Sequence, residues 1–136
     1  MKTVLLVDGD PAGGRMMEIS LQRLGGYRVI QSNDPQEIFA LTSQRQVHVI
    51  IMDVTLHGCI YEGRPIDGLE ISRRIKSDSH SSSIPILLST AHAMRGDEER
   101  LLNESHADAY LAKPIVDPRD LVKAVEALIQ RHNAGL

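Results

Sequence analysis

Short segments rich in apolar and β-branched residues alternate along the chain with longer segments whose apolar residues recur at helical spacing. Each short segment has four to six residues and is bounded by polar or turn-forming positions. This pattern is typical of strands that are buried on both faces of a sheet. The five segments of this kind are residues 4–7, 27–31, 47–52, 84–88 and 109–112.

A helix is predicted after each of these strands. Asp34-Pro35 and Asp117-Pro118 each combine an N-cap side chain with proline at the first helical position, and Gly25-Gly26 is a typical helix end. The five predicted helices begin at Pro11, at Pro35, near Asp67, near Asp97 and at Pro118. Strands that alternate with helices in this way predict an α/β fold, in which helices cover both faces of a parallel sheet.

The length of the chain limits the architecture further. A closed eight-stranded barrel needs about 250 residues, whereas this chain has 136. We therefore expect an open, doubly wound five-stranded parallel sheet in a single domain. Residues 1–132 are predicted to form that domain and residues 133–136 a short tail.

Composition and charge narrow the classes of partner and location. The net charge is −3, which argues against nucleic acid or an anionic membrane as the main partner. No apolar segment approaches the ~20 residues of a membrane span. The single cysteine, Cys59, excludes an internal disulfide, so we expect a cytoplasmic location.

Polar side chains follow four of the five predicted strands. Asp8 and Asp10 follow the first strand, Asp53 the third, Thr90 the fourth and Lys113 the fifth. Because the carboxyl ends of parallel strands meet at one edge of a sheet, these groups are expected to lie close together. Carboxylates suit Mg²⁺, while a lysine and a hydroxyl suit phosphoryl oxygens. The pattern indicates a site for a phosphoryl group in which one carboxylate acts as nucleophile.

Five sequence segments in the same order and at similar spacing resemble one known family. They are Leu5–Pro11, Val49–Asp53, Asp67–Glu70, Ile84–Ala91 and Ala109–Pro114. From Val4 to about His132 the chain resembles the receiver domain of two-component response regulators, the CheY-like family. The resemblance implies a flavodoxin-like sheet with strand order 2-1-3-4-5 and a signalling module rather than an enzyme.

The resemblance also implies roles for individual residues. Asp53 would be the phosphoacceptor, and Mg²⁺ would be held by Asp8, Asp53 and the backbone carbonyl of Thr55. Thr90 and Lys113 would bind the phosphoryl group, and Tyr110 would change rotamer together with Thr90. The bond before Pro114 would be cis. The implied partners are a sensor histidine kinase or phosphotransfer protein and a downstream protein, with the chain a monomer or weak homodimer.

The chain departs from the family pattern at three places near this site. Gly9 stands where a second acid usually binds the metal, and Asp10 is an alternative ligand if the loop shifts. His57 replaces a usual proline, and we expect it to flank the site together with His92. About seven extra residues lie within Cys59–Ile66, either over the site, with Glu62 or Arg64 near the phosphoryl group, or as an exposed loop.

Two alternative functions follow from these residues. Gly9 is compatible with a receiver that is impaired in phosphorylation and acts only as a protein-binding module. The Asp8-Gly9-Asp10 segment also resembles the Asp-x-Asp opening of haloacid-dehalogenase-type phosphatases, in which Asp8 would be the nucleophile. That family needs a late acidic pair for its metal, whereas the corresponding segment here ends in Lys113-Pro114.

Overall fold

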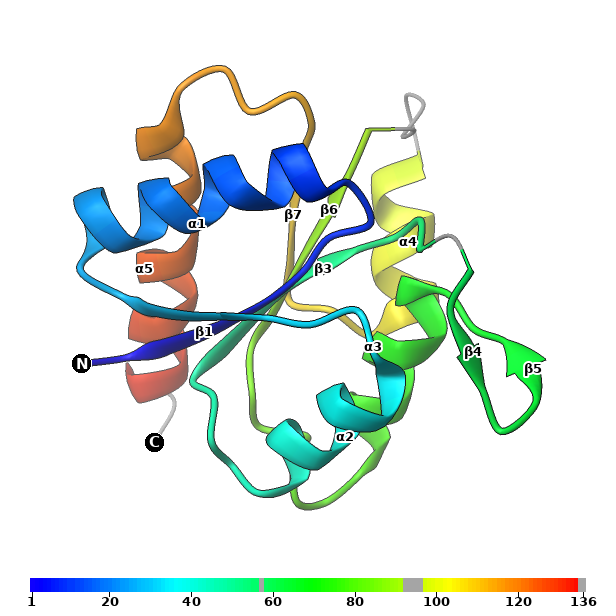
Figure 1. Cartoon of the computed structure of the whole chain (residues 1–136). Coiled ribbons are helices and arrows are strands. Elements are labelled where there is room, and N and C mark those ends of the chain that lie inside the picture. The colour runs from blue at the N-terminus through cyan, green and yellow to red at the C-terminus, as the bar shows by residue number, and fades with distance from the viewer. Residues whose placement is uncertain (57, 92–96, 135–136) are drawn as a thin grey trace.

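The computed structural model of the chain describes residues 1–56, 58–91 and 97–134. Its main element is a parallel sheet with strand order β2-β1-β3-β6-β7 (Figure 1). The strands are β1 (Thr3–Val7), β2 (Arg28–Gln31), β3 (Val49–Asp53), β6 (Ile86–Thr90) and β7 (Ala109–Ala112). The predicted fold class and strand order are confirmed.

Five helices connect and follow these strands. They are α1 (Pro11–Gly25), α2 (Pro35–Ser43), α3 (Gly68–Ser77), α4 (Asp97–Ser105) and α5 (Pro118–Ala134). The side chains of Asp34 and Asp67 accept the N–H groups of Gln36 and Glu70, so both aspartates cap a helix. In residues 1–56, 58–91 and 97–134, no helix is both long and apolar enough to cross a membrane.

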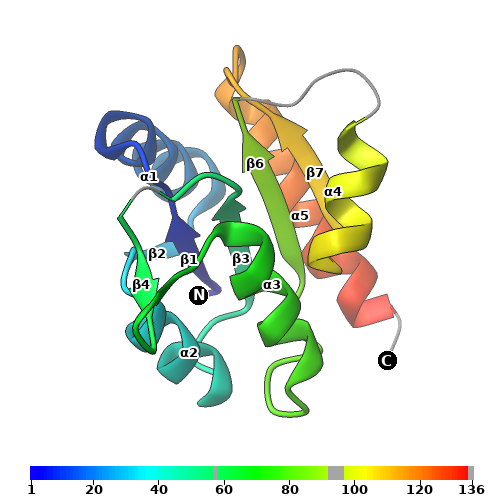
Figure 2. The same cartoon turned by 90° about the vertical axis from the view of Figure 1, so that its right-hand side faces the viewer.

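The helices cover the two faces of the sheet unequally. Side chains on β1 alternate between the faces, so Val4 and Leu6 contact α1 and α5, whereas Leu5 and Val7 face α2, α3 and α4. In Figure 2, α3 and α4 lie in front of the sheet and α5 behind it. All residues of the three central strands are buried, which explains why these strands are almost continuously apolar.

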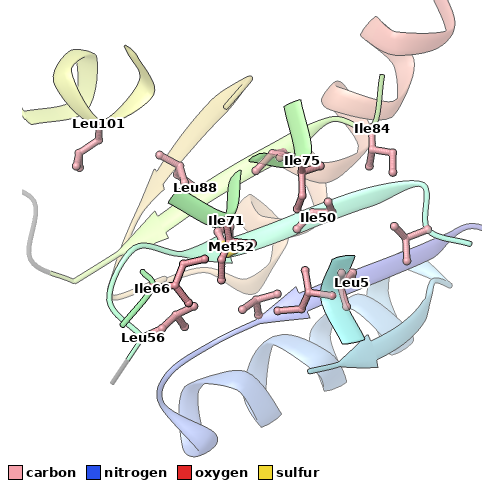
Figure 3. Packing of buried hydrophobic residues seen from close by; sticks show 14 residues of the cluster. Leu5, Ile50, Met52, Leu56, Ile66, Ile71, Ile75, Ile84, Leu88 and Leu101 are labelled. Carbon is pink, nitrogen blue, oxygen red and sulfur yellow. The ribbon is translucent and has the colours of Figure 1, made fainter. Parts of the chain in front are cut away.

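The larger core cluster lies between the sheet and α2, α3 and α4. Figure 3 shows Ile71 and Ile75 of α3 above Ile50 and Met52 of β3. Fully burying a side chain of this size contributes about 1.5–3 kcal/mol. This packing fixes β3, and with it Asp53 at the end of that strand, relative to α3.

Two strands begin two residues later than the apolar pattern predicted. Before β6, Pro85 has no N–H to donate to a ladder, so pairing starts at Ile86. Before β3, the N–H of Thr3 donates to Nδ1 of His48 at 2.9 Å. A side chain therefore provides the acceptor at that end of β1, and β3 starts at Val49.

The extra residues after β3 form a small antiparallel hairpin, β4 (Ile60–Tyr61) and β5 (Arg64–Pro65). Glu62 and Gly63 have φ values of 51° and 77°, and a two-residue loop with positive φ at both positions matches the right-handed twist of a hairpin. The hairpin lies beside α2 and α3 (Figure 1).

One aromatic side chain attaches the hairpin to these helices. The ring of Tyr61 makes an edge contact with Phe39 of α2, with 5.0 Å between centroids. The guanidinium of Arg74 in α3 lies over the same ring at 5.4 Å. Glu62 and Arg64 are exposed. The structure therefore favours the exposed arrangement of this segment over one that covers the site.

Candidate functional site

Polar side chains from four strands meet at the carboxyl edge of the sheet. Asp8 follows β1, Asp53 ends β3, Thr90 ends β6 and Lys113 follows β7. The strands are in register there, since Asp53 pairs with Ser89 and Thr90 with Ala112. The structure thus brings to one edge the residues that the sequence pattern predicted to be close.

Lys113 connects two of the carboxylates directly. Its Nζ atom lies 2.8 Å from Oδ2 of Asp8 and 3.4 Å from Oδ2 of Asp53. The side chains of Asp8, Asp53 and Lys113 are only 2%, 10% and 16% exposed. Solvent therefore screens these charges weakly, and each depends on its partners for stabilisation.

Burial alone would lower the pKa of the Lys113 amine. The hydrogen bond to Asp8 and the negative charges of Asp53 and Asp8 outweigh burial, and the pKa is raised. Lys113 is therefore cationic at neutral pH. Two carboxylates and one ammonium leave an excess of one negative charge, which favours a further cation.

Both oxygens of Asp53 are held by backbone donors. The N–H of Thr55 donates to Oδ1 at 3.2 Å, and the N–H of Gly9 donates to Oδ2 at 3.1 Å. Since Lys113 also reaches Oδ2, the carboxylate has a fixed orientation. The N–H of Gly9 is a contact that sequence reasoning missed, because the residue has no side chain to suggest it.

The position of Asp53 depends on a second glycine, Gly68. A Cβ atom on Gly68 would overlap the carbonyl oxygen of Asp53, and the N–H of Gly68 donates to the carbonyl of Val54 at 3.1 Å. Only a residue without a side chain lets α3 begin this close to the end of β3. The Asp67-Gly68 segment therefore combines a helix cap with this close approach.

Thr90 and Tyr110 lie on the side of the site nearest α4. Thr90 is buried at the end of β6, and its carbonyl accepts the N–H of Lys113 at 3.0 Å. Tyr110 is half-buried in β7, where burial and the negative charges of Glu98 and Asp97 raise its pKa. Its hydroxyl is buried and has no hydrogen-bond partner in the part of the chain that the structure describes.

Asp10 is placed as the N-cap of α1. Its carboxylate accepts the N–H of Ala12 at 3.2 Å, and its own N–H donates to Oδ1 of Asp8 at 2.7 Å. The Lys113-Pro114 bond is cis, as predicted. His57 and His92, which were expected to flank the site, lie outside the described residues.

The groups at this edge fit a hard cation in their chemistry. Asp8 and Asp53 supply carboxylate oxygens, and the carbonyl of Thr55 lies beside Gly9 in the loop after β3. Mg²⁺ is usually bound by one or two carboxylates and keeps several waters. In the described ranges, this edge included, no cluster of three or more His, Cys, Asp or Glu side chains could hold a metal ion, so a cation here would depend on two carboxylates, a backbone carbonyl and water.

This fold, with two buried carboxylates and a lysine at the carboxyl edge of its sheet, defines the class of small signalling receivers. Residues 4–126 match the family model of the response regulator receiver domain. The chain belongs to this family, whose members act in two-component signalling. The resemblance inferred from the sequence segments is confirmed.

Individual relatives support the same assignment. The chain is 31% identical to the phosphate regulon transcriptional regulatory protein PhoB of Pseudomonas aeruginosa, over 98% of this chain and 54% of that protein. The chain thus spans about half the length of this relative. It is 30% identical to the polar-differentiation response regulator DivK of Brucella anthropi, over 87% of this chain and 89% of that protein.

A solved structure shows the same fold with a metal ion. It is the receiver domain of the sensor histidine kinase PA1611 of Pseudomonas aeruginosa, described with a magnesium ion coordinated in the active site cleft. The TM-score is 0.79 and the identity 28%, with 95% of this chain and 98% of that chain covered.

Proposed function

We propose that this chain accepts a phosphoryl group on Asp53 and transmits a signal through contacts with another protein. The observation that carries this proposal is the contact of the Lys113 ammonium with both Asp8 and Asp53 at the carboxyl edge of the sheet. The ammonium can bind phosphoryl oxygens, because it is cationic and lies beside the Asp53 carboxylate to which phosphorus becomes bonded.

The reaction is a displacement at phosphorus. An oxygen of the Asp53 carboxylate forms a bond to phosphorus, and the bond between phosphorus and the leaving atom of the donor breaks. With a phosphohistidine donor, the electron pair of that bond returns to the imidazole nitrogen, which binds a proton from solvent. The product is an acyl phosphate on Asp53.

The residues around Asp53 contribute orientation and charge. The N–H groups of Thr55 and Gly9 hold the carboxylate in place, and Lys113 lies where negative charge increases as the phosphoryl group arrives. Mg²⁺, when bound by Asp8, Asp53 and the Thr55 carbonyl, neutralises charge on the carboxylates and on the phosphoryl oxygens. We expect the hydroxyl of Thr90, at the end of β6, to bind the same oxygens.

The phosphodonor is proposed to be a histidine kinase or phosphotransfer protein that docks beside α1. A mainly apolar groove lies between α1 and the loop from β7 to α5, and Lys113 lines both this groove and the site. Met16 at the groove and nearby Val116 are 68% and 91% exposed. A partner that covers these side chains would bring its phosphoryl group to Asp53.

The output is proposed to leave through the surface near α4 and β7. Phosphoryl charge at Asp53 acts on Thr90, which ends the strand next to β7, where Tyr110 lies. Charge added by a phosphoryl group commonly shifts such elements between two arrangements. The free thiol of Cys59 is compatible with a cytoplasmic location for both partners.

The proposal is tested by incubating the protein with acetyl phosphate and Mg²⁺ and mapping the labelled residue by mass spectrometry. We expect a mass increase of one phosphoryl group on Asp53 and none in the Asp53→Asn variant. Label on Asp8 with continuous release of phosphate would instead support a phosphatase. No label at any Mg²⁺ concentration would overturn the proposal and support a protein-binding module.

A further inference from the structure

The side chain of Ser89 is a buried hydroxyl beside Asp53 that the proposed function does not use. Ser89 is 1% exposed, and its Oγ atom has no hydrogen-bond partner within residues 1–56, 58–91 and 97–134. A polar group that is buried without a partner lowers the stability of a protein. This cost is removed if another state of the site supplies the partner.

Ser89 lies between Asp53 and β7, on the face of the sheet that α1 and α5 cover. In the register of the sheet, Ser89 pairs with Asp53 on one side and with Leu111 on the other. Leu87 and Ile51, two residues before Ser89 and Asp53, belong to the core cluster on that face. Since residues two apart in a strand share a face, the side chains of Ser89 and Asp53 lie on the same face.

The side chain of Lys113 crosses β6 on this face. In the sheet, β6 lies between β7, which Lys113 follows, and the two strands at whose ends Asp53 and Asp8 lie. The ammonium contacts both carboxylates, so it must extend over the end of β6. Lys113 and Ala91 line the groove beside α1, which places the crossing on the side of β6 where Ser89 lies.

Of the two charged neighbours of Ser89, Lys113 is the one that can move. Both oxygens of Asp53 accept backbone N–H groups, which hold the carboxylate in place. The Lys113 ammonium is carried by a flexible aliphatic stem and contacts the side chains of Asp8 and Asp53. A cation held by these carboxylates would repel the ammonium. Because the site is largely buried, the displaced ammonium then needs another acceptor.

We propose that Ser89 is a positioning residue whose hydroxyl accepts a hydrogen bond from the Lys113 ammonium when Asp8 and Asp53 bind Mg²⁺. The hydroxyl oxygen can accept this bond, and it has no partner to give up among the described residues. The contact keeps the ammonium beside Asp53, where it can bind the arriving phosphoryl oxygens. The inference rests on the proposed phosphoryl-accepting function and names a further residue of its site.

The Ser89→Ala variant tests this inference, because it removes only the hydroxyl. Without Mg²⁺, we expect the variant to be at least as stable as the wild type in urea unfolding, since no hydrogen bond is lost. Mg²⁺ binding, measured by calorimetry, should weaken by about tenfold, the effect of losing one hydrogen bond to a charged group. The ¹⁵N resonance of the Lys113 ammonium should coincide in the two proteins without Mg²⁺ and differ with it.

Three further variants control for packing. Ser72→Ala removes a hydroxyl that is also buried but donates to the carbonyl of Ser105 at 2.9 Å. It should lose stability and leave the dissociation constant for Mg²⁺ unchanged. Ser89→Thr and Ser89→Val have nearly the same shape, and only threonine keeps the hydroxyl. Ser89→Thr should therefore bind Mg²⁺ more tightly than Ser89→Val.

The inference and the proposed function fail in different ways. Equal dissociation constants for Mg²⁺ in Ser89→Ala and the wild type overturn the role of Ser89, even where Asp53 is labelled. A loss of stability in metal-free Ser89→Ala also overturns it, because the hydroxyl would then have a partner before Mg²⁺ binds. A wild type that binds no Mg²⁺ overturns it too, and labelling of Asp53 still decides the proposed function. Mg²⁺ binding that depends on Ser89, without any label on Asp53, overturns the proposed function alone.

Discussion

The ammonium of Lys113 lies 2.8 Å from the carboxylate of Asp8, across a site in which both side chains are largely buried. The two residues are 105 positions apart in the sequence. Their contact spans the carboxyl edge of the sheet, since β3 and β6 lie between β1 and β7. Lys113 is thus both a structural partner of Asp8 and a ligand available to a phosphoryl group on Asp53.

Removing the amine should expose this double role. Lys113→Ala leaves Asp8 and Asp53 without their shared cation, and breaking a buried pair costs about 3–5 kcal/mol. We expect the lower end of that range in urea unfolding without Mg²⁺, because Lys113 is 16% exposed. Added Mg²⁺ should restore part of the loss. Equal stability of variant and wild type without Mg²⁺ would show that the ion pairs are not stabilising.

Tyr110→Phe should stabilise the protein. The buried hydroxyl of Tyr110 has no hydrogen-bond partner among the described residues, and an unsatisfied buried polar group costs about 1–3 kcal/mol. We expect a gain of about 1 kcal/mol in the free energy of unfolding at neutral pH. Tyr27→Phe is the control, since the hydroxyl of Tyr27 is not an unsatisfied buried group. A loss of stability in Tyr110→Phe would contradict this account.

Stability should fall slightly as the pH drops below neutral because of His48. Partial burial of the imidazole, and then the positive charges of Lys2 and the N-terminus, lower the pKa of His48. The Nδ1 atom of His48 accepts the N–H of Thr3. His48 therefore binds a proton more readily in the unfolded chain than in the folded one. Its contribution to stability is fully present above the unfolded pKa of about 6.5 and is lost as the pH falls below that value. The effect is small because His48 is exposed.

The measurement compares the wild type with His48→Gln between pH 7.5 and pH 5, by urea unfolding. The glutamine carbonyl can accept the same N–H at every pH in this range. We therefore expect a flatter pH dependence in the variant. Parallel curves for the two proteins would exclude His48 as a source of the dependence.

Tyr61→Ala should detach the hairpin without affecting the site. The variant loses the contacts with Phe39 and Arg74. An aromatic pair contributes about 0.5–1.5 kcal/mol and an exposed cation–π contact about 0.5–1 kcal/mol. We expect a loss of about 2 kcal/mol in urea unfolding and unchanged labelling by acetyl phosphate. Arg64→Ala, on the exposed strand of the hairpin, is the control and should change neither quantity.

The parts of this structure that the sequence predicted depend on local patterns. The alternation of apolar segments and capped helices determines the fold, and polar residues after strands locate the site, because parallel strands end at one edge. The hairpin was missed because Glu62 has a φ of 51°, a conformation that glutamate rarely adopts and that no local signal marks. The contact of Gly9 with Thr55 was missed because it joins two loops far apart in sequence.

Gly68→Ala should be the most damaging of the glycine substitutions at the site. Its Cβ would overlap the carbonyl oxygen of Asp53 and approach Cα of Val54 to 3.1 Å. The start of α3 must then move away from β3, and inserting a group into such a packed contact costs about 1–3 kcal/mol or more. We expect a loss of about 3 kcal/mol in urea unfolding, together with slower labelling of Asp53 by acetyl phosphate. Gly13→Ala is the control, since a Cβ there would meet only the exposed side chain of Asp10, at 3.2 Å. If Gly68→Ala retained wild-type stability and labelling, α3 would not be what holds Asp53 in place.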